Sequence, residues 1–190
     1  MKNIPNILSL LRILVFPVLC FFIYDSQREY FILFLSIALV TDILDGAVAR
    51  IFKWKSELGA RLDSTADLLT SIAAISGLIF FERKFLNEHL VILLFVIVLW
   101  SLPYFASLVR FGKFPHLHLY SSKVTGYLLG IFFFTFFNFG YNALYFYFAM
   151  IFSSLSYCEE LIVIFFIREM RSDVKGLWWL LRRNPDQYDL

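Results

Sequence analysis

The chain has 190 residues, a usual length for one domain, but 60% of them are hydrophobic and 24 are phenylalanine, which excludes an ordinary soluble protein. The formal net charge of +2 is too small to indicate a nucleic-acid partner. Two cysteines, Cys20 and Cys158, fall within apolar segments and lack metal-binding spacing, so we expect neither a disulfide framework nor a cysteine metal site.

Six apolar segments, each about as long as the roughly 20 residues needed to cross a bilayer, are joined by short polar links. The first contains Arg12 and lacks a small-residue cleavage pattern, so we interpret it as a retained helix instead of a signal peptide. Between the third and fourth segments, Arg83, Lys84 and Glu88 indicate a solvated outer loop. We place the six spans at residues 6–24, 30–50, 59–81, 90–110, 121–139 and 144–167.

The tail at residues 176–185 combines Trp178 and Trp179 with a basic end, a composition typical of a short helix at the membrane interface. The predicted fold class is therefore all-α. We expect a polytopic membrane protein with a six-transmembrane-helix bundle, short loops and a short interfacial C-terminal helix.

The positions of Lys and Arg predict the orientation in the membrane. Fourteen of the 17 lie on the side of the N-terminus, and only Arg28, Arg83 and Lys84 lie on the other side. By the positive-inside rule, we expect both termini and the link at residues 51–58 to be cytoplasmic, in the inner (cytoplasmic) membrane of the cell.

Four aspartates stand out because charged side chains are rare within membrane spans and usually mark function there. Asp42 and Asp45 are three residues apart, and Asp63 and Asp67 are four apart, so each pair projects from one face of its helix. Two such helices facing each other would direct four carboxylates to one point, and a hard divalent cation would neutralise them. Solvated helix ends would explain these charges but not their spacing. We predict a site for two Mg²⁺ or Mn²⁺ ions.

Small residues surround these aspartates. Gly46 and Ala49 keep the helix face flat, Gly59 lies near the start of the next helix, and Arg50 offers a planar donor for phosphate oxygens. A flat cleft beside metal ions and an arginine suits a nucleotide diphosphate. The spacing DxxDGxxAR, eight residues, then GxxxDxxxD resembles the signature of the CDP-alcohol phosphatidyltransferase family. All of its fixed positions are met, at Asp42, Asp45, Gly46, Ala49, Arg50, Gly59, Asp63 and Asp67.

The resemblance implies one membrane domain over residues 1–190, and the positive-inside rule places the aspartate motif on the cytoplasmic side. It implies transfer of a phosphatidyl group from CDP-diacylglycerol to the hydroxyl of a small alcohol, such as glycerol phosphate or inositol, with release of CMP. The four aspartates would be metal ligands, and Asp67 would also be the general base. Gly46, Ala49, Arg50 and Gly59 would contact the CDP group.

Further candidates lie outside the aspartate motif. Asn6 and Arg12 belong to a segment that resembles the family's first span, and this resemblance implies that they contact the CDP group or support its pocket, although Asn6 could equally be a helix cap. Arg110 and Lys123, at neighbouring helix ends, could hold an anionic acceptor or reach lipid phosphate. One of the two acids Glu159 and Glu160 could bind a polyol or cationic head group, or form a structural hydrogen bond to a neighbouring helix.

The acceptor and the wider class stay open. Ser64 and Leu68 stand where glycerol-phosphate enzymes of the family commonly have Pro and Lys. Alternatives are transfer of a head group from CDP-choline or CDP-ethanolamine to diacylglycerol, an aspartate-rich prenyltransferase, and a non-catalytic cation-binding transporter. The expected partners are the CDP-linked lipid donor, the alcohol acceptor and membrane lipids, without nucleic acid, and a homodimer is left open.

Overall fold

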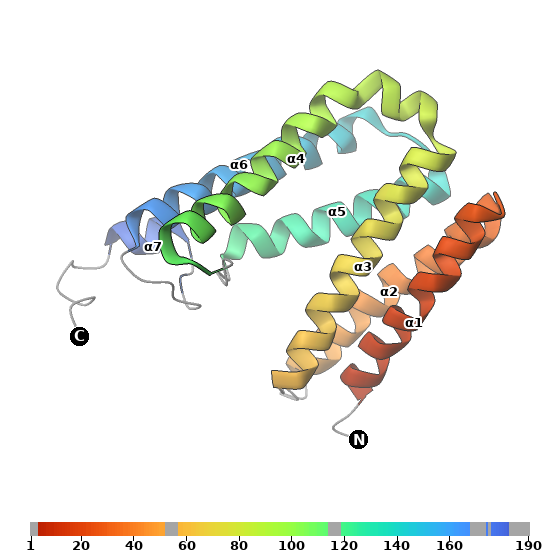
Figure 1. The fold of residues 1–190 in the computed structure, drawn as a ribbon, viewed down its shortest axis with the longest axis horizontal. Helices are drawn as coiled ribbons and strands as arrows, with labels where there is room; N and C mark the ends of the chain where they lie inside the picture. The colour runs from red at the N-terminus through yellow and green to blue at the C-terminus, as the bar shows by residue number, and fades with distance from the viewer. Residues whose placement is uncertain (1–3, 52–56, 114–118, 168–173, 175, 183–190) are drawn as a thin grey trace. The chain divides into compact units, whose positions relative to one another are not determined.

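A computed structural model describes residues 4–51, 57–113, 119–167, 174 and 176–182. Within this part of the chain the regular structure is entirely helical. Figure 1 shows helices α1 (Ile4–Tyr24), α2 (Arg28–Ile51), α3 (Glu57–Phe81), α4 (Arg83–Phe111), α5 (Tyr120–Phe139), α6 (Ala143–Phe166) and α7 (Leu177–Arg182).

The helices confirm the all-α membrane class. Each of the six predicted apolar segments lies in one helix, apart from Ile167, which caps α6. Three of them, α1, α4 and α6, are long and apolar enough to cross a membrane. Helix α3 has a shorter apolar part, Thr65–Phe81, because its first residues carry the polar motif. Spanning by α2, α3 and α5 therefore stays a prediction.

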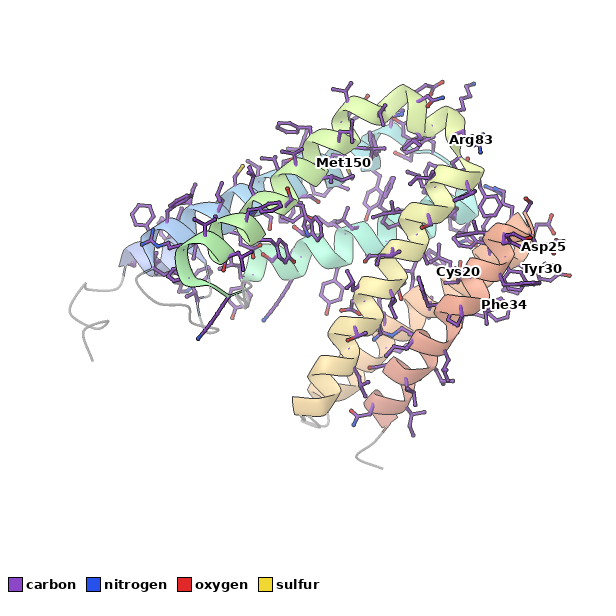
Figure 2. All side chains as sticks on the ribbon, in the orientation of Figure 1. Cys20, Asp25, Tyr30, Phe34, Arg83 and Met150 are labelled. Atoms are coloured by element: carbon purple, nitrogen blue, oxygen red, sulfur yellow. The ribbon has the colours of Figure 1, made fainter. Side chains whose placement is uncertain are left out.

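The predicted outer loop at Arg83, Lys84 and Glu88 is wrong, because these residues form the first turns of α4. Only Glu82 separates α3 from α4, and its carbonyl accepts a hydrogen bond from the backbone N–H of Leu86 at 2.9 Å. Phe85 is buried while Arg83, Lys84 and Glu88 are exposed, so the polar residues cover the outer face of an amphipathic turn. Figure 2 labels Arg83 at this corner between the two helices.

The chain forms two compact units, which are described separately. The first comprises Met1–Glu88 and Phe133–Gly140. In it, α1 packs against both α2 and α3 (Figure 1). Phe31 is fully buried in its core, with its ring centroid 5.3 Å from that of Phe81 and 5.6 Å from that of Phe137. Asn138 donates a hydrogen bond to Ser36 Oγ at 2.8 Å, which joins the end of α5 to α2.

Gly77 lets α3 approach this aromatic core closely. A Cβ at this position would overlap with the ring of Phe31 and would lie 3.3 Å from Cζ of Phe137. Because Phe31 is fully buried, its ring has little room to move away. The glycine is therefore required by close packing between α2 and α3.

The second unit comprises His89–Phe132 and Tyr141–Leu190. Its apolar cluster joins the ends of three long helices to α7 and contains Leu119, Val163, Ile164, Ile167 and Val174, with Ala106, Phe111, Leu177 and Leu180 packed against it. Arg110 of α4 donates hydrogen bonds to the carbonyls of Phe165, at 2.9 Å, and Ile167, at 3.1 Å. It thereby satisfies carbonyl groups at the C-terminal end of α6.

Helix α7 is attached to α6 through a carboxylate. Glu159 Oε1 accepts a hydrogen bond of 2.8 Å from the backbone N–H of Leu177, the first residue of α7. Trp178 and Trp179 are 59% and 47% exposed, and the guanidinium of Arg182 lies 4.3 Å from the Trp178 ring centroid. The predicted C-terminal helix is confirmed. Its place at the membrane interface stays a prediction.

Gly77→Ala should destabilise the first unit by about 1–3 kcal/mol, because the added methyl group overpacks the core around Phe31. Thermal unfolding of the detergent-solubilised protein would show this as a lower Tm. Gly126→Ala is the matched control, because a Cβ at this position in α5 meets nothing within 4 Å and should be neutral or slightly stabilising. Equal Tm values for the two variants would contradict the packing role of Gly77.

Glu159→Ala should loosen α7, because the backbone N–H of Leu177 loses its carboxylate partner. Trypsin cleavage after Arg182, followed by mass spectrometry, should become severalfold faster than in the wild type. Glu159→Gln retains a carbonyl oxygen that can accept the same hydrogen bond, so its cleavage rate should stay near that of the wild type. If the alanine variant were cleaved no faster than the wild type, α7 would be held by apolar contacts alone.

Candidate metal centre

Three carboxylates converge in the first unit. Asp42 comes from α2, and Asp63 and Asp67 come from successive turns of α3. One oxygen from each lies within 4.8 Å of the others. The spacing of four residues explains why Asp63 and Asp67 share a face of α3. Packing of α1 against both other helices holds that face and Asp42 around one point.

Arg12 lies in the middle of these carboxylates. Its Nη1 donates hydrogen bonds to Oδ1 of Asp42 and, at 2.7 Å, to Oδ1 of Asp67, while its Nη2 donates to Oδ1 of Asp63 at 2.7 Å. The Arg12 side chain is 1% exposed, whereas the carboxylate side chains are 36–51% exposed. The guanidinium therefore supports the cluster from its buried side, and the carboxylates remain open on the other side.

The charges in this cluster do not balance. When all three of these described carboxylates are ionised, they carry two more negative charges than the one guanidinium balances. Like charges about 5 Å apart repel by roughly 3 kcal/mol at an effective dielectric constant of about 20. A further cation on the exposed side would relieve this repulsion.

The donor set fits a hard divalent cation. Mg²⁺ binds oxygen ligands at about 2.1 Å, so two ligands on opposite sides of one ion lie about 4.2 Å apart. The carboxylate oxygens, within 4.8 Å of one another, need only small side-chain movements to share an ion. Each carboxylate also has a second oxygen, so an ion could bind without loss of the Arg12 hydrogen bonds. The cluster of Asp42, Asp63 and Asp67 can thus hold a metal ion.

For several residues predicted to bind the metal or the nucleotide, the structure describes the backbone but not the contacts of the side chain. Asp45, Gly46, Ala49 and Arg50 lie on the last turns of α2, but their side chains, like the link at residues 52–56, lie outside the described part of the structure. Gly59 is half-buried near the start of α3, and Asn6 is half-buried in the first turn of α1. Their contacts with a nucleotide stay predictions.

Arg110 and Lys123, predicted to bind the acceptor, both lie in the second unit. The guanidinium of Arg110 is hydrogen-bonded to carbonyls at the end of α6, and Lys123 Nζ lies 5.6 Å from the Tyr120 ring centroid. The hydrogen bonds of Arg110 join α4 to α6, whereas the contact of Lys123 lies within α5. An additional role in acceptor binding stays a prediction.

For Glu159 and Glu160 the sequence left two alternatives, binding of a ligand or a structural hydrogen bond to a neighbouring helix. Both residues form the structural hydrogen bond. Glu159 accepts from Leu177, and Glu160 Oε2 accepts from Ser122 Oγ at 3.3 Å. The second contact joins α6 to α5, so both acids connect helices within the second unit.

The ion pairing of Arg12 was missed by the sequence analysis, although a signal for it exists. Arg12 is the only charged residue in the sequence of α1. A lone cation in an apolar span normally requires an acidic partner within the protein. That rule would have indicated the aspartates as partners of Arg12, since they lie in the next two segments of the chain, on the side of the predicted bundle where Arg12 lies.

The buried His89 was also missed. It lies in α4, its Nε2 is 2.9 Å from the hydroxyl of Tyr141, and its ring packs edge-on against Phe146 at 4.7 Å between centroids. This contact joins α4 to the start of α6. A single histidine in an apolar segment carries no spacing signal that would reveal it.

Comparison with known proteins gives partial matches to curated relatives. CDP-diacylglycerol–glycerol-3-phosphate 3-phosphatidyltransferase from Cereibacter sphaeroides is 40% identical over 38% of this chain and 35% of its own length. The protein of the same name from Aquifex aeolicus is 32% identical over 48% of this chain and 52% of its own length. Cardiolipin synthase (CMP-forming) from Rattus norvegicus is 43% identical over 39% of this chain and 25% of its own length. The chain thus spans about a quarter to a half of these relatives.

No solved structure showed a significant match to the chain. The family model described as CDP-alcohol phosphatidyltransferase matches residues 2–165, which is most of the chain and includes Arg12 and the three converging aspartates. This chain therefore belongs to the CDP-alcohol phosphatidyltransferase family.

Proposed function

We propose that this protein transfers a phosphatidyl group from CDP-diacylglycerol to the hydroxyl of a small alcohol, such as glycerol phosphate or inositol, and releases CMP. The observation that carries the proposal is the convergence of Asp42, Asp63 and Asp67 around Arg12 in a chain of this family. The names of the glycerol-3-phosphate relatives include CDP-diacylglycerol as donor, which favours this donor over CDP-choline or CDP-ethanolamine. Family membership argues against a prenyltransferase or a transporter.

Asp42, Asp45, Asp63 and Asp67 would hold Mg²⁺ or Mn²⁺, in a site for two ions. When bound, the metal supplies positive charge that stabilises the diphosphate and the CMP leaving group. Gly46, Ala49 and Gly59 would leave space for the nucleotide beside these carboxylates. Arg50 would donate hydrogen bonds to phosphate oxygens, and Asn6 would support the nucleotide from α1.

Asp67 would act as the general base. Its side chain is 51% exposed and accepts from Arg12 through Oδ1, so the carboxylate can meet an acceptor from the open side. As the acceptor oxygen forms a bond to the phosphorus that carries diacylglycerol, the bond from that phosphorus to CMP breaks. The hydroxyl proton passes to Asp67, and the electron pair of the broken bond leaves with CMP.

The acceptor is the least constrained part of the proposal. The names of two relatives favour glycerol phosphate, whereas Ser64 and Leu68 depart from the pattern of such enzymes. Arg110 and Lys123 would provide positive charge for an anionic acceptor. The test is to incubate purified protein with CDP-diacylglycerol and a panel of alcohols and to measure CMP. Release that depends on one alcohol is expected, and no release with any of them would overturn the proposal.

Asp67→Asn and Asp42→Asn should have different kinetic defects. Loss of the base should lower kcat by about 10²- to 10⁴-fold with little change in the KM for CDP-diacylglycerol. Loss of Asp42 should weaken binding of the metal and the donor, because it removes a ligand charge. Steady-state kinetics and Mn²⁺ titration would separate the two. If Asp67→Asn weakened donor binding with unchanged kcat, Asp67 would be only a ligand.

We also propose that both termini and the active site face the cytoplasm, in the inner membrane. The excess of Lys and Arg on that side supports this orientation. The native cysteines are free and Cys20 is exposed, so Cys20 and Cys158 must first be replaced. A single cysteine at Ser56 should then react with an impermeant maleimide only in opened cells, and a cysteine at Arg83 also in intact cells. The reverse pattern would contradict the orientation.

A further inference from the structure

Arg12 is an unusual residue in its surroundings. It is the only charged residue in the sequence of α1, a helix apolar enough to cross a membrane, and its side chain is 1% exposed. A cation buried in this way destabilises the fold unless anions surround it. In this structure three carboxylates from two other helices do so.

The geometry places Arg12 where the carboxylates converge. Both Nη atoms are used, and each of the three aspartates offers its Oδ1 to the guanidinium. The oxygens that can approach a common metal ion are therefore on side chains already drawn together by a cation of the protein itself. Without that cation, the carboxylates would repel one another across the gap between α2 and α3.

We propose that Arg12 is the resident counter-cation of the aspartate cluster: it holds the cluster together before metal binds, and its charge lowers the affinity for the divalent cation. The inference rests on the proposed metal-dependent function and adds a determinant of metal affinity. Arg12 acts here as a positioning residue for the carboxylates and not through contact with the nucleotide.

Two opposite effects follow from the same charge. Removing the guanidinium should destabilise the metal-free protein, because three carboxylates are left without their shared donor. It should also strengthen divalent metal binding, because one positive charge no longer repels the ion at short range. A residue that only filled space in the bundle would produce the first effect without the second.

The experiment compares the full chain with variants in lipid nanodiscs, using Mn²⁺ as the probe. Arg12→Gln should lower the Tm without metal, bind Mn²⁺ at least about tenfold more tightly in an EPR titration, and gain more Tm than the wild type when Mn²⁺ is added. Arg12→Lys keeps the charge but not the planar fork of donors, so its Mn²⁺ affinity should stay near the wild-type value. Arg28→Gln is the matched control. Arg28 is 47% exposed and forms its ion pair with Glu82, which is not part of the aspartate cluster.

The double variant Arg12→Gln/Asp42→Asn keeps the proposal testable even if the single variant folds poorly. It retains the wild-type balance of two excess negative charges, so its metal-free Tm should exceed that of Arg12→Gln. Mn²⁺ binding by Arg12→Gln that is unchanged or weaker would overturn the proposal. So would a raised KM for CDP-diacylglycerol with unchanged Mn²⁺ affinity, since that would assign Arg12 to nucleotide binding.

Failure of this inference is distinguishable from failure of the proposed function. If the wild type releases CMP but Arg12→Gln binds Mn²⁺ no more tightly, only the role of Arg12 is lost. If Arg12→Gln binds Mn²⁺ more tightly while the wild type releases no CMP from CDP-diacylglycerol with any alcohol, the role of Arg12 stands and the enzymatic proposal is lost.

Discussion

The first unit depends on one set of ion pairs, those between the buried guanidinium of Arg12 and three aspartates. Carboxylates at the ends of apolar helices are costly, and a lone buried arginine is costly too. Pairing them lowers the free-energy cost of both, and it also defines how α1, α2 and α3 must be arranged. The same pairing leaves the outer sides of the carboxylates exposed. The groups that hold the three helices together can therefore also bind a metal ion.

Packing elsewhere in this unit supports that arrangement. Gly77 allows α3 to lie against Phe31 of α2, and Asn138 connects the end of α5 to the same helix. The first contact holds α2 and α3 close together, and the second attaches α5 to α2. A metal centre depends on such rigid support, because displacing catalytic groups by about an ångström can lower the rate of the reaction severely.

Much of this architecture could be predicted from the sequence. Apolar segments of spanning length predicted six long helices, and spacings of three and four residues predicted that aspartates would share helix faces. The start of α4 was missed because the first turns of a helix tolerate polar residues, so Arg83 and Lys84 resemble a loop in composition alone. Burial of Phe85, which distinguishes a helical turn from a loop, depends on contact with Phe136, a residue far away in the chain.

The partners of individual charges were harder to predict. Arg12, Arg110 and Glu159 each suggested a ligand contact, yet each forms a bond that holds helices together. A charged side chain in an apolar span must find a partner, but the sequence does not indicate whether that partner is a substrate or another helix. The three-dimensional arrangement reveals the partner on the other helix, and a ligand contact of the same side chains stays a prediction.

The most direct test of the account is a structure determined from crystals grown with Mn²⁺ and a CDP-linked lipid. We predict an anomalous difference peak of Mn²⁺ within about 2.3 Å of carboxylate oxygens of Asp42, Asp63 and Asp67, with the diphosphate on the exposed side of the cluster and Arg12 on its buried side. Mn²⁺ bound elsewhere, or a diphosphate bound away from these three aspartates, would contradict the assignment of the cluster as the metal and diphosphate site.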